Sequence, residues 1–329
     1  CFRFWYLENN GKTNTKCWLV YQQIMIAIKK ISKKIFKEFN DSNFKYKDLI
    51  NLDKKKRSLF YKKNKNIVNW SKKIKKQLKN KYPIMLFDMR NLKNELNIDK
   101  FRNFFIYFSC SLGNLLPQNS KNEKTVLIYN RGKSYSMKFG ARYHQTNEGG
   151  QIHTDNVNIL QSWDFLGIAC ISQAQLGGDL LVIDGNKVYF FLKKNYPNQL
   201  KILKENFYWE ERGLSNKIFR APIIKKNNNK INFRYLRVYL VSAHNKAKKR
   251  LRKSQIHALD ILDSVLYDPK FQLKTKLKKY QILITMDSRI LHGRIAFKDK
   301  SKAVDLNTYY LKNKKNIIKR TMERVWIKN

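Results

Sequence analysis

Cysteine is scarce in this chain of 329 residues, and the four that occur are Cys1, Cys17, Cys110 and Cys170. They form no CxxC pair and no dense framework, so a disulfide-stapled scaffold is excluded and a reducing cytoplasm is the expected location. Long apolar runs are also missing. The best of them, residues 104–117, is interrupted by serine, glycine and asparagine and falls short of the roughly 18 residues that span a bilayer. We therefore expect no membrane span, and residues 1–10 lack the pattern of a secretory signal.

Acidic residues are few as well, since 24 Asp and Glu stand against 69 Lys and Arg, which gives a formal charge of +45. Such a charge is typical of proteins that bind nucleic acid or an acidic membrane surface. Lys, however, far outnumbers Arg and comes with abundant Asn, Ile, Phe and Tyr, the amino acids of A/T-rich codons. Arg is the residue that reads bases in bidentate fashion. We therefore favour compositional drift over a binding patch and expect any binding of nucleic acid to be non-specific.

No linker rich in Pro, Gly or Ser divides the chain, and 43% hydrophobic residues suffice for a core, so a disordered chain is excluded. Residues 1–100 form a Lys-rich N-terminal segment that we expect to be helical, and residues 101–329 form the main domain. Further helices are expected over residues 67–78 and 101–116. The first expected helix shows apolar residues at three- and four-residue steps, namely Ile24, Ile28, Ile31, Ile35 and Phe39. We expect it to pack on the body of the protein in preference to lying on a membrane.

After residue 120 the pattern changes to short runs typical of strands, several of them separated by turns rich in Gly or Asn. One helix is expected among them, over residues 255–266, and an exposed turn over residues 225–230. Helices followed by many short strands predict an α+β protein with a sandwich or barrel of strands. The expected strands cover residues 124–129, 178–183, 188–192, 234–241 and 280–286.

The most informative stretch is GGQIHTD at residues 149–155. On a strand, residues two apart point to the same face, so His153 and Asp155 would project together. One imidazole and one carboxylate, joined by a second histidine, complete the two-His, one-carboxylate set of non-haem Fe(II) oxygenases. The second histidine is His292, which follows the apolar strand expected at 280–286.

The chain has five histidines, and the remaining three lack this context. We expect His144, His244 and His257 to be ordinary surface or core imidazoles, although His144 is close enough to His153 to line the site.

Two arginines near the C-terminus, Arg320 and Arg324, lie four residues apart and share a face of any extended segment. A planar guanidinium pairs bidentately with a carboxylate, which suits the far carboxylate of a 2-oxoacid co-substrate. Taken alone, two arginines in a basic C-terminus are as well explained by solvated charges.

Four motifs in order make the chain similar to the taurine dioxygenase and clavaminate synthase superfamily of Fe(II)- and 2-oxoglutarate-dependent oxygenases. The resemblance runs from about residue 110 to the C-terminus. It implies a double-stranded β-helix, or jelly roll, with flanking helices and with the metal in its mouth. The motifs are GGQIHTD, then GGD at 177–179, DSRILHGRIAF at 287–297, and KRTMERVWI at 319–327.

The resemblance also assigns the site. His153, Asp155 and His292 match the catalytic iron ligands, and Arg320 matches the arginine that binds 2-oxoglutarate. Arg324 matches an arginine that in several members faces an acidic group of the substrate. The two arginines could exchange these roles, so both are predicted as cofactor-binding residues.

The chain departs from the family at two places. Leu180 follows the GGD turn where the family often has a threonine that helps to hold 2-oxoglutarate. The stretch between His292 and Arg320 is also longer than usual, and its Lys-rich insert at 298–315 must loop out if Arg320 is to return to the barrel.

The expected function is hydroxylation of an unactivated C–H bond of a small amino-acid-like or natural-product substrate, with O2 consumed and succinate and CO2 formed. Arg324, and also Arg294, suit an acidic group on that substrate. Asp155 argues against halogenation, whereas desaturation and ring formation stay open. Two alternatives remain: the same chemistry on a nucleic-acid or carrier-bound substrate, and a basic nucleic-acid-binding protein with an inactive site. Trp163, Trp209 and Trp326 are expected to be core aromatics.

Overall fold

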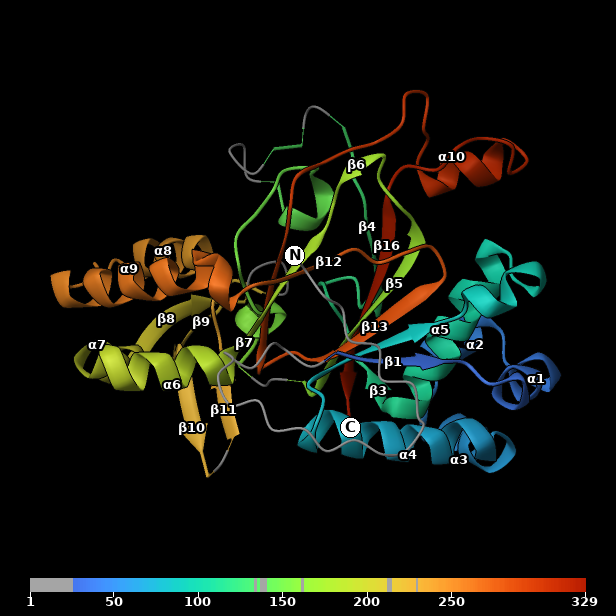
Figure 1. Cartoon of the computed structure of the whole chain (residues 1–329), viewed down its shortest axis with the longest axis horizontal. Helices are drawn as coiled ribbons and strands as arrows, with labels where there is room; N and C mark the ends of the chain where they lie inside the picture. The colour runs from blue at the N-terminus through green and yellow to red at the C-terminus, as the bar shows by residue number, and fades with distance from the viewer. Residues whose placement is uncertain (1–25, 133–134, 137–140, 161–162, 212–214, 229) are drawn as a thin grey trace, which may run out of the picture.

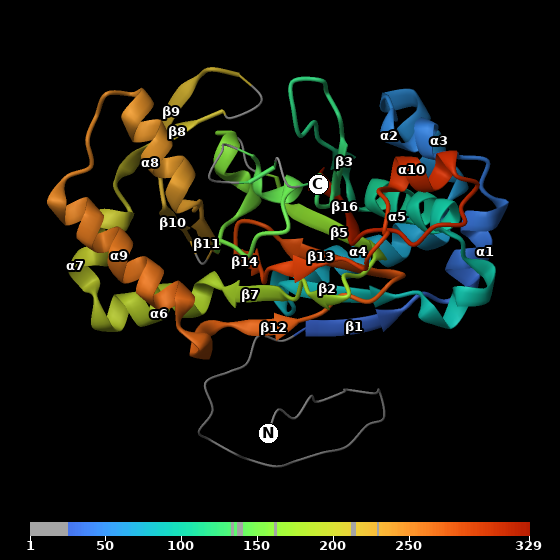
Figure 2. The same ribbon diagram turned by 90° about the horizontal axis from the view of Figure 1, so that it is seen from above.

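The computed structural model describes residues 26–132, 135–136, 141–160, 163–211, 215–228 and 230–329. The expectations for Cys1, Cys17, Ile24 and a signal sequence lie outside these residues. Figures 1 and 2 show strands in the middle of the molecule, the helices of residues 33–112 on one side, and the helices of residues 185–267 on the other.

The largest sheet has the order β1-β2-β13-β5-β16-β3, with β4 also paired to β16. β1 and β2 are parallel, and the other neighbours are antiparallel. Alternate residues of β5 face opposite sides, because side chains in a strand point up and down in turn. The strands of this large sheet are β1 (Ile26–Lys30), β2 (Ile84–Asp88), β3 (Asn114–Leu115), β4 (Thr125–Ile128), β5 (Phe165–Ser172), β13 (Gln281–Met286) and β16 (Thr321–Lys328).

A smaller antiparallel sheet has the order β12-β7-β14 and faces the large one across a shared core. It consists of β12 (Leu273–Thr275), β7 (Leu180–Asp184) and β14 (Ile290–Arg294). Val182 and Ile290 point inward to meet Ile168 of β5 and Met322 of β16. The outer side of this sheet, at Ile183 and Leu291, packs against a separate helical core.

The helices cover the outer faces of the two sheets (Figure 2). Beside the large sheet lie α1 (Lys33–Asp41), α2 (Tyr46–Ile50), α3 (Lys54–Lys63), α4 (Lys65–Asn80), α5 (Ile98–Leu112) and α10 (Leu306–Leu311). Beside the small sheet lie α6 (Gly185–Asn195), α7 (Pro197–Leu203), α8 (Arg237–Lys246) and α9 (Lys253–Tyr267), with the hairpins β8 (Asn206–Glu210)–β9 (Ile218–Pro222) and β10 (Ile224–Asn227)–β11 (Lys230–Phe233). Short pieces complete the chain: β6 (Leu176–Gly177), β15 (Phe297–Lys298) and the 3₁₀ turns η1 (Arg90–Glu95), η3 (Tyr143–Gln145), η4 (Asp155–Asn158) and η5 (Pro269–Phe271). Within the described ranges, no helix has the length and apolar character needed to cross a bilayer.

The N-terminal segment is not wholly helical, which corrects the prediction from sequence. Residues 26–30 form strand β1 where the periodicity predicted a helix, and the helix α1 begins only at Lys33, with Ser32 as its N-cap. Ile28 is exposed, whereas Ile31 and Ile35 are buried, so the apolar spacing spans two elements. Strands β1 and β2 also hydrogen-bond into the main sheet. The division at residue 100 stays a prediction, and the two parts share one hydrophobic core.

Two runs predicted as strands are instead parts of helices. Residues 188–192 lie in α6, whose buried residues Val188, Tyr189 and Leu192 follow helical spacing. The second run, predicted as a strand over residues 234–241, begins after β11 has ended at Phe233, and its residues 237–241 lie in α8. Short apolar runs of β-branched and aromatic residues fit either state, so packing decides between them. The helices at 67–78, 101–116 and 255–266 are confirmed as α4, α5 and α9, although α5 ends at Leu112.

The α+β class is therefore confirmed, with two facing sheets and flanking helices. Between the described strands, hydrogen bonds do not close the two sheets into one barrel. Closure into a complete double-stranded β-helix stays a prediction.

A buried ion pair joins the N-terminal helices to β16. Glu323 is fully buried and accepts hydrogen bonds from Nε and Nη2 of Arg102 in α5, both at 2.9 Å, and from the hydroxyl of Tyr46 in α2. A buried carboxylate that loses its cation keeps the cost of desolvation without the compensating attraction. This pair therefore holds α5 in register with β16, the strand that carries Arg324.

Replacing Arg102 by methionine is expected to lower the free energy of unfolding by about 3–5 kcal/mol, because Glu323 is left buried and unpaired. Urea denaturation followed by circular dichroism measures it. The control Arg252→Met removes a pair with Glu205 in which both side chains are well exposed, and should cost at most about 1 kcal/mol. The double variant Arg102→Met/Glu323→Leu should recover most of the loss. Equal stability of Arg102→Met and Arg252→Met would refute the assignment.

Candidate active site

A cavity of about 100 Å³ opens between the two sheets. Apolar walls come from Ile168, Leu180 and Met322 of the strands and from Leu277. The polar lining includes Gln118, Arg142, Tyr143, His144, His153, Asp155, Asn158, His292, Arg294, Arg320 and Arg324.

Two histidines lie side by side in this cavity because their backbones pair. His153 and His292 form an isolated antiparallel bridge in which each backbone N–H donates to the other residue's carbonyl at 2.8 Å. Directly opposed residues in such a pair bring their Cβ atoms to about 4.5–5.5 Å. The ring centroids are accordingly 4.4 Å apart. The pairing between segments far apart in the sequence thus creates the histidine pair.

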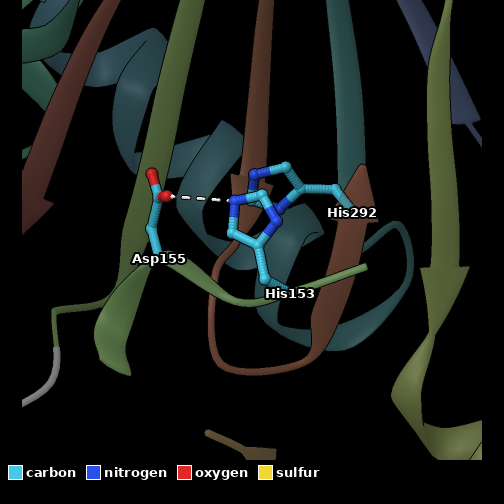
Figure 3. Close-up of side chains that lie close together, drawn as sticks. All are labelled: His153, Asp155 and His292. Carbon is cyan, nitrogen blue, oxygen red and sulfur yellow. Dashed lines mark ion pairs between the residues drawn. The ribbon is translucent and has the colours of Figure 1, made fainter. Parts of the chain in front are cut away.

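Asp155 completes the group (Figure 3). One donor atom each from His153, Asp155 and His292 lie within 4.8 Å of one another, and His153 Nε2 is 3.6 Å from Asp155 Oδ1. The sequence predicted that His153 and Asp155 share the face of one strand. The structure instead has a single bridge at His153, after which η4 begins at Asp155. The Asp155 N–H donates to Asp287 Oδ1 at 3.0 Å, which fixes this turn.

Both histidines can present a lone pair to a metal. The Nδ1–H of His153 donates to the carbonyl of Gln151 at 2.8 Å, which leaves Nε2 free on the side of Asp155. Such a hydrogen bond sets the tautomer and ring orientation of metal-binding histidines. Burial, and then the neighbouring His153, lower the pKa of His292 to about 3, so this imidazole is neutral.

Asp155 is held as a carboxylate by two residues of β16. Arg324 Nη1 donates to both of its oxygens at 3.0 Å, and the indole Nε1 of Trp326 donates to Oδ2 at 3.2 Å. Burial acts to raise the pKa of Asp155, but Arg324 and His153 outweigh it and hold that pKa well below its usual range. Trp326 is the core aromatic that was predicted, stacked at 3.9 Å on Trp163, and its bond to Asp155 was missed. The signal was available, because residues 322, 324 and 326 share one face of an extended strand.

Arg320 lies in the cavity wall with a free donor. Its side chain is buried, and its Nη1 has no hydrogen-bond partner among the described residues. Burial, and the nearby guanidinium of Arg294, lower the pKa of Arg320 to about 10. Gly178 makes room for it: this residue has φ +74°, and a Cβ there would lie 2.9 Å from Arg320 Nε. The GGD turn of the sequence motif thus lies directly against this arginine.

The long insert before Arg320 does loop out, as its return to the barrel requires. Residues 306–311 form α10, where Tyr310 donates to Asp99 at the start of α5. The chain then comes back, and the Arg320 N–H donates to Asp299 Oδ1 at 2.6 Å. Leu180 lines the cavity, so that position supplies an apolar wall and no hydroxyl group.

Arg294 and Gln118 support the walls of the cavity. Arg294 was predicted to face an acidic substrate. Its Nη2 donates to the carbonyls of Thr146 and Glu148, at 3.0 and 2.7 Å, and its guanidinium lies over the ring of Tyr143, while its buried Nε has no partner among the described residues. Gln118 was missed, and its Oε1 accepts from Arg324 Nε at 2.8 Å.

The other three histidines occupy two kinds of position. His244 is a structural residue that accepts from the Tyr208 N–H and bonds to the carbonyl of Lys249, and His257 is exposed, both as predicted. His144 lines the cavity, and burial lowers its pKa to about 3, with Arg324 and Arg142 adding to the shift.

Solved structures share this fold. Asparagine oxygenase in complex with Fe(II), 2S,3S-3-hydroxyasparagine and succinate matches with a TM-score of 0.65 over 91% of this chain and 93% of that one, at 10% identity. The non-heme iron oxygenase OrfP in complex with Fe and alpha-ketoglutaric acid matches with a TM-score of 0.61 over 92% and 94%, at 11% identity.

A curated relative matches part of the sequence. FR-33289 synthase of Streptomyces rubellomurinus is 24% identical over 193 residues, which cover 57% of this chain and 55% of the relative. The chain thus spans about half the length of this relative.

A family model also matches, over residues 60–310, which include His153, Asp155 and His292 but end before Arg320. The position of Arg320 therefore rests on the structure. Because that match covers well over half of the sequence, the chain belongs to the taurine catabolism dioxygenase TauD, TfdA family.

Proposed function

We propose that this protein is an Fe(II)- and 2-oxoglutarate-dependent oxygenase that hydroxylates an unactivated C–H bond of a small, acid-bearing substrate. One observation carries the proposal. The side chains of His153, Asp155 and His292 converge in the same cavity into which Arg320, buried and with a free donor, also projects.

The three convergent residues fit a metal. Two neutral imidazoles and one carboxylate make up the donor set of non-haem iron oxygenases, which leaves further coordination positions open for other ligands. Arg324 and Trp326 hold the Asp155 carboxylate, and Gln151 holds the His153 ring, in the manner of groups that orient metal ligands. When bound, iron supplies the redox chemistry by which O2 oxidises 2-oxoglutarate to succinate and CO2 and converts a C–H bond to an alcohol.

Arg320 is the residue that would hold the far carboxylate of 2-oxoglutarate. A buried guanidinium with an unused donor is costly unless an anion pairs with it. Leu180, Leu277 and Met322 line the same cavity and keep water away from that pair. Arg324 stays a second candidate for contact with an anion, although much of its hydrogen-bonding capacity is used by Asp155 and Gln118.

The convergence of several polar side chains in one cavity supports a small-molecule substrate. Among the structural relatives, one complex contains a hydroxylated asparagine, and OrfP has been solved with L-Arg and its hydroxylated forms. Nucleic-acid or carrier-bound substrates, an inactive site, and a cytoplasmic location stay predictions of the sequence, and no specific observation favours the first three.

The test is succinate formation by the purified chain with Fe(II), ascorbate, O2 and 2-oxoglutarate, with and without pooled amino acids and small organic acids. We expect succinate that depends on Fe(II), stops when a chelator removes the metal, and increases with at least one substrate in the pool. Mn(II) binding, followed by electron paramagnetic resonance, and 2-oxoglutarate binding, followed by calorimetry, report on the site when the substrate is missing from the pool. Absence of both kinds of binding would overturn the proposal.

A further inference from the structure

The polar groups of the cavity differ in whether the protein already uses them. Arg324, Gln118 and Arg294 are each hydrogen-bonded to other parts of the wall. Another set has no hydrogen-bond partner among the described residues. That set includes Nε of Arg294 and also Nη1 of Arg320, which belongs to the co-substrate position proposed above.

Further polar residues of the cavity lining lie on the segments that flank the histidine–aspartate stretch. Arg142 immediately precedes η3, and His144 lies within it. Asn158 ends η4, which begins at Asp155. All three line the cavity, and Asn158 Oδ1 is buried there without a hydrogen-bond partner among the described residues. Buried polar atoms are normally hydrogen-bonded, so one that is left without a partner in a cavity marks the place of a ligand.

We infer that Arg142, His144 and Asn158 form the substrate subsite, in which Arg142 binds an oxyanion of the substrate and the other two bind neighbouring polar groups. This inference rests on the proposed function. A guanidinium suits a carboxylate, sulfonate or phosphonate because its planar fork donates two parallel hydrogen bonds. His144 is neutral, so it contributes a hydrogen bond without adding charge.

The charges of the lining exclude a basic group as the main recognition element. Its described residues include four arginines, and Asp155 is the only carboxylate among them. Asp155 is occupied by Arg324 and is directed at the metal position. The charges of Fe(II) and of doubly ionised 2-oxoglutarate cancel, so the positive excess remains when both are bound. An ammonium or guanidinium group of a substrate would find no free carboxylate there, whereas an acid would find Arg142.

The test compares short alkyl ligands that differ in the charge of their head group. Pentanoate, propane-1-sulfonate and propylphosphonate are titrated against pentylamine by calorimetry, under nitrogen, into protein that contains Mn(II) and 2-oxoglutarate. We expect at least one acid to bind at least about tenfold more tightly than the amine, since a hydrogen bond to a charged group is worth about 1.5–3 kcal/mol.

Arg142→Gln should weaken binding of that acid by about 10- to 100-fold, and Arg142→Lys by less, because lysine keeps the charge without the fork. Arg220→Gln is the matched control, because Arg220 is an exposed arginine on β9, outside the cavity lining. Arg220→Gln should bind the acid with the same affinity as the wild type. Mn(II) and 2-oxoglutarate affinities should be unchanged in all three variants.

The outcomes separate the two proposals. The subsite is refuted if no acid binds, if pentylamine binds as tightly as the acids, or if Arg142→Gln and Arg220→Gln behave alike while Mn(II) and 2-oxoglutarate still bind. Charge-selective binding that needs Arg142, in a wild type that binds neither Mn(II) nor 2-oxoglutarate, would support the subsite and overturn the oxygenase assignment.

Discussion

Replacing Asp155 by asparagine is expected to abolish Fe(II)-dependent succinate formation while the protein stays folded. Asp155 is the only carboxylate of the three convergent donors, and its anionic oxygens are the hard ligands that an iron(II) site requires. Removal of a group that only orients a metal ligand lowers metal affinity by roughly 10- to 100-fold. The affinity for Mn(II) should fall by more than this, because Asp155 is itself a predicted ligand. Asparagine is preferred to alanine because its oxygen still accepts from Arg324 and Trp326.

Asp155→Ala provides the contrast. It removes the partner of Arg324, a guanidinium whose side chain is only 13% exposed, and so should also lower the free energy of unfolding by about 3–5 kcal/mol. Asp164→Asn is the control, because Asp164 lies near Lys328 at the other end of β16 and outside the cavity lining. Wild-type Mn(II) affinity and succinate formation in Asp155→Asn would exclude Asp155 as a ligand.

Replacing Arg320 by methionine is expected to raise the KM for 2-oxoglutarate by about 30-fold or more, since truncating one member of a buried charge pair costs roughly 2–5 kcal/mol. Mn(II) affinity should change little, because Arg320 makes no hydrogen bond to the triad. In the absence of ligand the variant should melt no lower than the wild type, because a buried guanidinium with an unsatisfied donor is itself unfavourable. Steady-state kinetics and thermal melts with and without 2-oxoglutarate measure these effects.

Arg320→Lys should fall between the wild type and Arg320→Met, since lysine keeps the positive charge but loses the bidentate geometry. Arg220→Met, at an exposed position outside the cavity lining, controls for the loss of one positive charge from a very basic protein. If 2-oxoglutarate raises the melting temperature of Arg320→Met as much as that of the wild type, another residue binds its far carboxylate. Arg324 would then be the first to examine, because the sequence left the two roles interchangeable.

The residues proposed to bind the metal and the co-substrate were predicted from the amino-acid sequence and its family resemblance. His153, Asp155, His292, Arg320 and Arg324 all line one cavity. Local spacing alone does not relate Arg320 to Arg324, because Arg320 precedes β16 and the pairing of β16 with β5 shifts in register between Thr321 and Met322. The requirement that the Lys-rich insert loop out follows from residue order alone.

Other features depend on which segments pack together. The apolar run at 188–192 fits a strand by composition, but Asp184 caps a helix before it and the helical core beside the small sheet buries one face of that helix. Strand β1 exists because β2 offers a parallel edge, a pairing that the spacing of Ile28 and Ile31 does not encode. The spacing of apolar residues shows which face of a helix or strand is apolar, but it does not show which other element packs against that face.

By itself, then, the sequence determined the donor types, their order along the chain and the excess of positive charge. Only the tertiary structure decided which donors remain free. Arg324 pairs with Asp155 and Arg294 Nη2 with the carbonyls of Thr146 and Glu148, whereas Arg320 Nη1 has no hydrogen-bond partner among the described residues. The physical reason is that a hydrogen bond between distant segments requires their atoms to meet within about 3 Å. The register of β16, β14 and the loops before η3 and η4 sets those distances, and no local pattern of residues does.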